Sequence, residues 1–335
     1  MRIFLTHDDE SRANYYGDRA LAGLKGLGEV RCNESAAPLS GDALIAAAAG
    51  AEVVVCDRAT PGAAALFDAC PELIAFLRCA VDARTIDIEA ASRNGVLVTN
   101  ASPGFVDAVA ELTFGLMIDL AREVTKHATA YHQGRREEIH MGRQLSGSVL
   151  GVLGYGSIGR RVAALGQALG MRVLACDPYQ TISEAGVEPV EMDALLAQSD
   201  FVVCLVVANE KTEKLLDAAA LSRMRPSAFL INMARGNLID EAALGAALAS
   251  GGIAGAAMDV GRAPDQMPSP ALAALPNVIA TPHIGGLTPT AIESQAMETV
   301  AQVAALSEGR LPHNALNAAE ASRLARLGIA VGAPA

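Results

Sequence analysis

The chain has 335 residues, of which 51% are hydrophobic and 19% charged, so we expect a folded protein with about two domains rather than a disordered chain. A formal net charge of −11 argues against nucleic acid or an anionic membrane surface as a partner. It leaves a small anionic substrate open, since a local basic pocket can outweigh the global charge.

The six cysteines include no Cys-x-x-Cys pair and no metal-type spacing. We therefore expect free thiols, no metal site and a reducing environment. The N-terminal apolar run is too short for a signal peptide, and no stretch approaches the ~18 uninterrupted apolar residues of a membrane span. The expectation is a soluble, cytoplasmic protein with no membrane partner.

Residues 1–100 alternate between two kinds of pattern. Short apolar runs predict strands, and segments with helical spacing lie between them, so this part predicts a parallel sheet. The strands are expected at 3–5, 52–56, 73–77 and 96–98, and the helices at 12–27, 41–49, 62–69 and 87–93. One long helix is expected at 105–130.

Residues 149–178 carry the most informative motif. An apolar run of strand type leads into a Gly-x-Gly-x-x-Gly turn, apolar positions at helical spacing follow, and a second apolar run ends on Asp177 about 20 residues after the turn. The first glycine permits a tight turn, the second lets backbone approach a pyrophosphate, and the third allows close packing of helix and strand.

Phosphates would bind the unpaired N–H groups at the start of this helix. Asp177 would accept a hydrogen bond from a ribose 2′-hydroxyl and repel a 2′-phosphate, so the motif favours NAD over NADP. The alternative is a glycine-rich turn in an ordinary α/β protein. The predicted cofactor-binding residues here are Gly154, Tyr155, Gly156, Ser157, Ile158, Gly159 and Asp177.

The rest of the chain continues the alternation. Strands are expected at 201–207, 228–232, 253–260 and 278–280, and helices at 240–249 and 290–306. We predict an α/β fold with two Rossmann-like, doubly wound parallel-sheet domains, in which a cofactor domain (101–284) is inserted into a discontinuous substrate domain (1–100 and 285–335). Such an insertion predicts that ligand binds between the domains, at the carboxyl ends of the strands.

Two side chains are placed for chemistry. Arg235 follows a predicted strand in INMARGNLID, and His283 follows another in ATPHIGG. An imidazole can exchange a proton with a carbinol or carbonyl oxygen near neutral pH. The alternatives are an arginine paired with surface acids and a histidine that caps a turn.

These motifs together resemble the D-isomer-specific 2-hydroxyacid dehydrogenase family. The similar segments are VLGVLGYGSIG with Asp177, INMARGNLIDEAAL, GAAMDV, NVIATPHIGG, RCAVDARTIDIEAA and VAELTFGLM, between about Glu72 and Leu306. The resemblance implies an NAD-dependent enzyme, usually a dimer built on the cofactor domain. The resemblance further implies that such an enzyme interconverts a small 2-keto acid and its D-2-hydroxy acid.

The resemblance also implies residue roles. Arg235 matches the arginine that holds the substrate carboxylate and carbonyl oxygen, His283 the acid/base, and Asp259 the acid that contacts the nicotinamide carboxamide. The resemblance also predicts that the cofactor contacts a further set of residues, namely Met233, Ala234, Arg235, Asp259, His283 and Gly285.

The chain departs from the family pattern at two functional places. Pro264 stands where the glutamate that orients the histidine is usual, so either the neighbouring Asp265 replaces it or His283 acts alone. The usually glycine-rich substrate loop reads Val81-Asp82-Ala83-Arg84. Arg84 would bind a second anionic group or pair with a nearby aspartate.

The absent glutamate keeps a second class of function open. A non-catalytic, NAD(H)-sensing protein on the same fold, like the corepressors that resemble this family, is the alternative to the enzyme. If the protein is an enzyme, oxidation of a 3-phosphoglycerate-like substrate and reduction of glyoxylate or hydroxypyruvate are both open.

Overall fold

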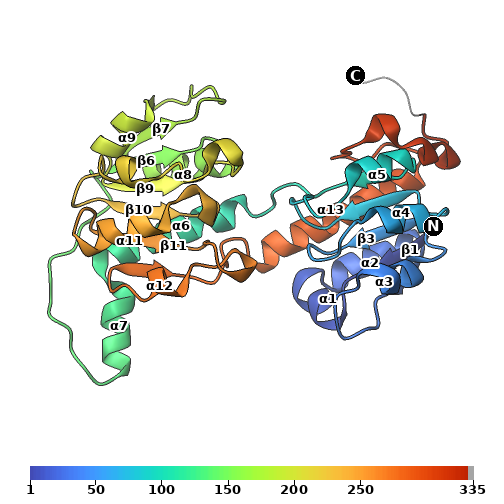
Figure 1. The fold of residues 1–335 in the computed structure, drawn as a ribbon, viewed down its shortest axis with the longest axis horizontal. Helices are drawn as coiled ribbons and strands as arrows, with labels where there is room; N and C mark the ends of the chain where they lie inside the picture. Colours follow the sequence, from blue (N-terminus) through green and yellow to red (C-terminus); the bar gives the residue numbers. More distant parts are fainter. Residues whose placement is uncertain (331–335) are drawn as a thin grey trace. The chain divides into compact units, whose positions relative to one another are not determined.

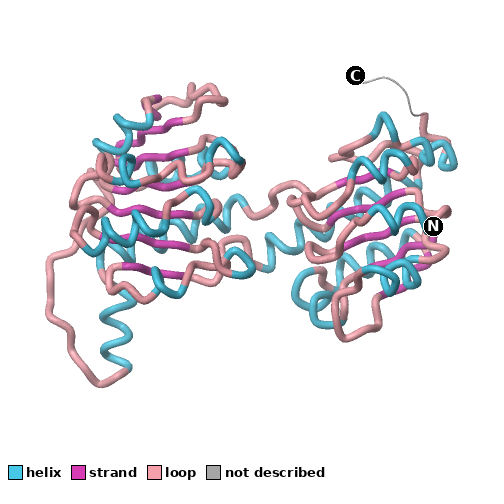
Figure 2. The backbone as a smooth tube through the Cα atoms, in the orientation of Figure 1, coloured by secondary structure: helices cyan, strands magenta, loops and turns pink. Residues whose placement is uncertain are grey.

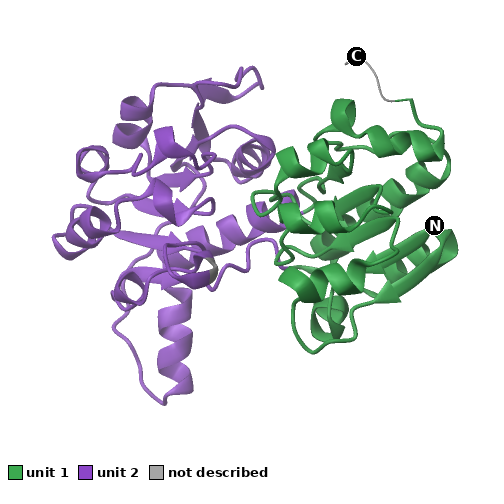
Figure 3. Ribbon diagram, turned by 45° about the vertical axis from the view of Figure 1, so that its right-hand side comes forward, with its two compact units in different colours: residues 1–104, 288–335 green, residues 105–287 purple. Residues whose placement is uncertain are grey.

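The computed structural model describes residues 1–330, apart from the side chain of Asp265. The chain forms two compact units, Met1–Gly104 with Thr288–Ala335 (unit 1) and Phe105–Leu287 (unit 2), coloured separately in Figure 3. The chain therefore leaves unit 1 after Gly104 and re-enters it at Thr288. The domain boundaries expected from the sequence, after residues 100 and 284, lie a few residues earlier. The end of the predicted segment 285–335 lies outside the described residues.

Unit 1 contains a five-stranded parallel sheet in the order β2-β1-β3-β4-β5 (Figure 1). Its strands are β1 (Arg2–Leu5), β2 (Glu29–Cys32), β3 (Val53–Cys56), β4 (Ala75–Arg78) and β5 (Leu97–Thr99). Its helices are α1 (Asp9–Tyr15), α2 (Asp18–Leu27), α3 (Gly41–Ala48), α4 (Ala64–Ala69), α5 (Ile88–Arg93) and α13 (Pro289–Ser307), followed by 3-10 turns at Ala318–Glu320 and Ser322–Leu327.

Successive residues of these strands enter different cores, because side chains alternate across a sheet. Ile3 and Leu5 pack with residues of α2 and α13, whereas Phe4 and Val54 pack with residues of α3 and α4. Both faces of the sheet are therefore covered by helices, which is why strands such as β3 are buried at every position.

Unit 2 contains a seven-stranded parallel sheet in the order β12-β11-β10-β9-β6-β7-β8. The strands, drawn in magenta in Figure 2, are β6 (Val149–Leu153), β7 (Arg172–Cys176), β8 (Val187–Pro189), β9 (Phe201–Cys204), β10 (Phe229–Asn232), β11 (Gly255–Met258) and β12 (Val278–Ala280). The helices are α6 (Val106–Arg122), α7 (Val124–His132), α8 (Ser157–Ala168), α9 (Met192–Gln198), α10 (Ala218–Leu221), α11 (Glu241–Ala249) and α12 (Pro270–Ala273), with 3-10 turns at Glu210–Thr212, Gly236–Leu238 and Pro264–Gln266.

This sheet is also covered on both faces. Val152, Val203 and Ile231 pack with α6 and α8, whereas the alternate residues Val202 and Leu230 pack on the other side. Two doubly wound parallel α/β units confirm the predicted fold class. The order reverses between β6 and β9, and the carboxyl edge at such a switch point is where open α/β sheets bind ligands.

Two predicted helices are wrong, and one strand was not predicted. The helix expected at 12–27 is divided between α1 and α2 at Gly17, whose φ is +84°. The helix expected at 105–130 is interrupted at Glu123, in the left-handed conformation with φ 52°. The edge strand β2 was missed because it is only half-buried and lacks an apolar run.

No helix in the described part of the chain is long and apolar enough to cross a membrane. All six cysteines are free thiols, as expected from their spacing.

Candidate active site

The glycine turn lies at the carboxyl end of β6, between β9 and β7. Gly154 has a φ of +92°, and a Cβ there would lie 2.6 Å from the carbonyl oxygen of Leu205. A Cβ on Gly159 would lie 2.2 Å from the oxygen of Gly154. Both positions therefore require glycine, one for conformation and close approach to the next strand and the other for helix packing.

Gly156 differs from these two glycines. A Cβ added to it would meet no atom within 4 Å, so the protein itself gives no reason for glycine there. Gly156 is also the N-cap of α8 and provides no side-chain cap, so the first N–H groups of this helix have no side-chain acceptor. Open space beside uncapped N–H groups fits the pyrophosphate of a dinucleotide.

Asp177 follows β7 and is tied to the glycine turn. One carboxylate oxygen accepts from the N–H of Tyr155 (2.7 Å), and the other accepts from the N–H groups of Tyr179 (2.8 Å) and Gln180 (3.2 Å). These bonds hold the carboxylate at the carboxyl end of β7, where a ribose hydroxyl would reach it.

A cavity of about 380 Å³ lies beside Asp177. Burial, together with the carboxylates of Glu191 and Asp177, raises the pKa of the Cys176 thiol in its wall. The cavity is lined by Ala175, Cys176, Asp177, Pro178, Gln180, Ile182, Pro189, Val190 and Glu191. Two carboxylates near the ribose position disfavour a 2′-phosphate, so the site fits NAD.

Arg235 lies three residues past β10, on a segment fixed by Asn232. The fully buried Asn232 side chain donates to the carbonyl oxygen of Arg235 (2.9 Å) and accepts from the N–H of Ala234 (3.1 Å). The half-buried guanidinium of Arg235 donates to the carbonyl oxygen of Ala234 (2.6 Å), among other interactions. The sequence analysis missed Asn232, although a polar residue at the end of an apolar run is a detectable signal.

Asp259, which follows β11, holds the turn that carries His283. Its carboxylate is 2% exposed and accepts from the hydroxyl of Thr281 (2.6 Å) and the N–H groups of Ile284 (2.9 Å) and Gly285 (2.8 Å). These contacts bracket His283, whose φ of 55° is uncommon for a residue other than glycine and costs of order 1 kcal/mol or more. Asp259 thus stabilises a strained turn that the chain would not otherwise favour.

Arg235, Asp259 and His283 follow three adjacent strands, β10, β11 and β12. Since neighbouring strands are about 4.8 Å apart, the first and the third of these strands are separated by roughly 10 Å. The predicted residues Met233, Ala234 and Gly285 belong to the same segments, and the glycine turn and Asp177 lie at the same edge. Unit 2 thus gathers the predicted cofactor residues at one edge of one sheet.

The remaining predicted residues are placed as follows. Asp265 lies in the 3-10 turn Pro264–Gln266, and its side chain is outside what the structure describes. Residues 81–84 form the loop after β4 in unit 1. There Asp82 and Arg84 form an exposed ion pair (2.6 Å), one of the alternatives left open for Arg84, and hydrogen bonding to Asp82 raises the pKa of Arg84.

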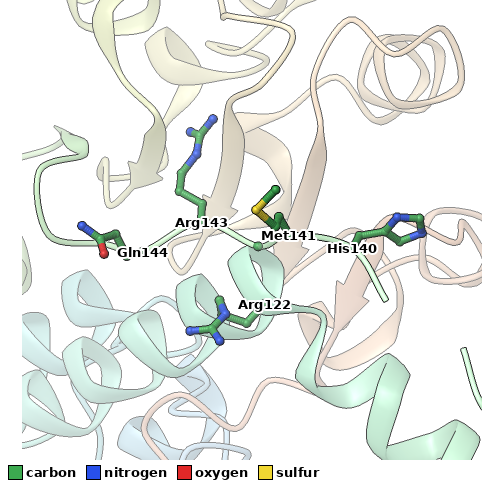
Figure 4. A pocket seen from close by; sticks show the side chains of 6 residues that line it. Arg122, His140, Met141, Arg143 and Gln144 are labelled. Atoms are coloured by element: carbon green, nitrogen blue, oxygen red, sulfur yellow. The ribbon is translucent and has the colours of Figure 1, made fainter. Parts of the chain in front are cut away.

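A larger cavity, of about 430 Å³, lies elsewhere in unit 2 (Figure 4). It is lined by Arg122, His140, Met141, Gly142, Arg143 and Gln144. Arg143 pairs with Asp200 (3.0 Å), which also accepts from the N–H of Val149 at the start of β6. This cavity therefore lies at the amino edge of the sheet, opposite the edge that carries the glycine turn.

Comparison with known proteins agrees with this geometry. Residues 114–285 match the family model described as "D-isomer specific 2-hydroxyacid dehydrogenase, NAD binding domain". The chain is 32% identical over 255 residues to a hydroxypyruvate reductase of Thermotoga maritima, which covers 75% of this chain and 83% of that protein. It is 33% identical over 299 residues to a D-3-phosphoglycerate dehydrogenase of Methanocaldococcus jannaschii, which covers 88% of this chain and 56% of that protein.

Among solved structures, the TT0316 protein of Thermus thermophilus matches with a TM-score of 0.83 and 31% identity, covering 94% of this chain and 100% of that chain. The chain spans only about half the length of the D-3-phosphoglycerate dehydrogenases that it matches.

Proposed function

Because the chain belongs to the D-isomer specific 2-hydroxyacid dehydrogenase family, we propose that it is an NAD-dependent enzyme that interconverts a small 2-keto acid and its D-2-hydroxy acid. The observation that carries the proposal is the arrangement in unit 2, where Arg235, Asp259 and His283 follow adjacent strands at the edge bearing the glycine turn. This arrangement combines a dinucleotide site with an arginine and an imidazole.

We assign the cofactor to the predicted residues of unit 2. The N–H groups of Ser157 and Ile158 would hold the pyrophosphate at the open face of Gly156, and Asp177 would accept from the adenosine ribose. NADH, when bound, supplies a hydride to the substrate's carbonyl carbon.

The protein's own contribution is binding and proton transfer. The planar guanidinium of Arg235 would bind the substrate carboxylate and stabilise the charge that develops on the carbonyl oxygen. The imidazolium of His283 would give a proton to that oxygen, and the neutral imidazole would take it back in the oxidation. Val81, Asp82, Ala83 and Arg84 are the proposed substrate-binding residues of unit 1.

We also keep the proposal that Asp265 takes the place of the usual glutamate beside His283. A carboxylate beside the imidazole would orient the ring for proton transfer. Asp265→Asn would then change the pH–rate profile of turnover. Superimposable profiles of the variant and the wild type would leave His283 acting alone.

The main experiment follows NADH absorbance with a panel of 2-keto acids, including glyoxylate and hydroxypyruvate, and determines the configuration of the product. We expect turnover to a D-2-hydroxy acid, lost in Arg235→Gln and His283→Asn while NADH binding persists. NADH binding with no turnover of any 2-keto acid would contradict the enzyme and favour the NAD(H)-sensing alternative.

We further propose a homodimer built on unit 2. In Figure 1, α7 and the segment after it extend away from the unit 2 sheet. This arm exposes apolar side chains at Val124 (51%), Tyr131 (68%) and Ile139 (91%). Apolar residues gathered on a projecting arm are typical of a surface that packs against a second copy of the chain.

A further inference from the structure

Two loops meet at the carboxyl edge of the unit 1 sheet, one after β3 and one after β4. Backbone bonds join them: the N–H of Gly62 donates to the oxygen of Thr85 (3.1 Å), and the N–H of Asp87 donates to the oxygen of Gly62 (2.8 Å). The second loop contains the proposed substrate residues 81–84, so the position of these residues depends on the first loop.

The substrate loop presents backbone donors without the glycines usual in the family. No residue of 79–87 has a positive φ. Within the described part of the chain, the N–H groups of Val81 and Ala83 donate no hydrogen bond. Neighbouring unpaired N–H groups are suited to an oxyanion such as a carboxylate, provided that the backbone is held still.

Arg78, the last residue of β4, forms hydrogen bonds with both loops. Its side chain is fully buried and donates to the carbonyl oxygens of Asp57 (2.5 Å), Arg58 (2.6 Å) and Thr60 (2.9 Å), and to the hydroxyl of Thr85 (2.9 Å). The first three acceptors belong to the loop after β3, and the fourth belongs to the substrate loop.

The acceptors of Arg78 are unusual for a buried cation. No ion pair to Arg78 is present among the side chains that the structure describes, so three carbonyls and one hydroxyl stabilise its charge. Burying a charge is costly, and the hydrogen bonds of both terminal nitrogens offset part of this cost, whereas the buried Nε–H has no partner among the described residues. Only the planar fork of a guanidinium reaches four acceptors in two loops, whereas a lysine ammonium has three donors at one point.

We propose that Arg78 is a positioning residue for the substrate carboxylate: it joins the two loops and so fixes the N–H groups of Val81 and Ala83. It acts through the backbone and does not touch the substrate. This inference rests on the proposed function, because it assigns those N–H groups to a 2-keto acid.

The test uses a pair of substitutions at Thr85, the exposed acceptor of Arg78, which leave the buried core unchanged. Thr85→Val keeps the shape of the side chain and removes the acceptor, whereas Thr85→Ser keeps the hydroxyl. We expect KM for the 2-keto acid to rise about 3- to 10-fold in Thr85→Val, as for one lost hydrogen bond at an exposed site where water can partly replace the acceptor, with kcat within about twofold. Thr85→Ser should restore the wild-type KM, and the Kd for NADH should be unchanged in both.

Arg78→Lys should raise KM by about tenfold or more, since several bonds are lost together. The matched control is Arg323→Lys, because Arg323 also donates to two carbonyl oxygens of unit 1, those of Cys70 (2.8 Å) and Leu73 (2.7 Å), but at the opposite end of β4. This control should leave KM unchanged.

Hydrogen exchange gives a readout that needs no substrate. The N–H groups of Ile86 and Asp87, which are bonded to Ala83 and Gly62, should exchange faster in Thr85→Val and at the wild-type rate in Thr85→Ser. Wild-type KM and exchange in Thr85→Val, or an equal rise of KM in Arg323→Lys, would overturn the inference. If the wild type binds NADH but reduces no 2-keto acid, the proposed function fails, and unchanged exchange in Thr85→Val would then overturn this inference as well.

Discussion

Replacing Asp259 by asparagine tests whether this residue holds the turn of His283. Asparagine is nearly isosteric, and one oxygen can still accept from the hydroxyl of Thr281 and the N–H of Ile284. The other oxygen becomes an NH₂ group, which faces the N–H of Gly285 instead of accepting from it (2.8 Å in the wild type). The substitution therefore removes one charge-assisted hydrogen bond inside a buried site.

The expected magnitude follows from that bond. A hydrogen bond to a charged group contributes about 1.5–3 kcal/mol, and each 1.36 kcal/mol corresponds to a factor of ten in an equilibrium. The ordered turn, with His283 at a φ of 55°, should become less populated by about 10- to 100-fold relative to relaxed conformations. We expect kcat for 2-keto acid reduction to fall within that range, measured by NADH absorbance.

A matched control separates this effect from general destabilisation. Asp217 also accepts a backbone N–H, that of Ala220 (2.8 Å), at the start of α10. Asp217→Ala removes this N-cap acceptor and should lower the free energy of unfolding in urea without lowering kcat. Wild-type kcat in Asp259→Asn, at temperatures where both proteins are folded, would refute the role assigned to Asp259.

Four further outcomes are expected. Gly156→Ala should leave the melting temperature near that of the wild type and weaken NADH binding by tenfold or more. Gly159→Ala should lower the melting temperature, because its Cβ would lie 2.2 Å from a backbone oxygen. Calorimetry measures the melting temperature and NADH fluorescence measures binding, so together they distinguish the two variants. Asp177→Ala should lower the ratio of NADH to NADPH activity, measured at equal cofactor concentrations, and an unchanged ratio would contradict the assignment of the ribose. Burial lowers the pKa of His7 to about 4, below its value of 6.5 in an unfolded chain, so the folded state disfavours the proton. The free energy of unfolding is then highest above pH 6.5 and falls by on the order of 3 kcal/mol as the pH drops toward 4. Urea denaturation of His7→Gln should show a weaker pH dependence of this free energy between pH 6.5 and 4. Tyr131→Asp should halve the mass found by light scattering, and an unchanged mass would count against the arm as the dimer contact.

The local parts of the site were predictable from sequence because their physics is local. The strand, glycine turn and helix of 149–168 occupy consecutive residues, and Gly154 and Gly159 have steric roles that their spacing indicates. Arg235 and His283 were recognisable for the same reason, since each comes three residues after an apolar strand. Element boundaries were less accurate where one residue decides, as at Gly17 and Glu123, because a left-handed residue ends a helix without changing the apolar pattern.

The sequence by itself determined the fold class, the family and the residue types available for chemistry, because hydrophobic periodicity and motif spacing depend only on the order of the residues. Only the tertiary structure decided what holds those residues in place. Asp259 meets the turn of His283 because β11 and β12 are adjacent, and Arg78 joins loops that follow two neighbouring strands. Apart from the bond between Arg78 and Thr85, these contacts link residues 18 or more positions apart. No local pattern encodes which buried donor meets which acceptor once parallel strands have aligned their carboxyl ends.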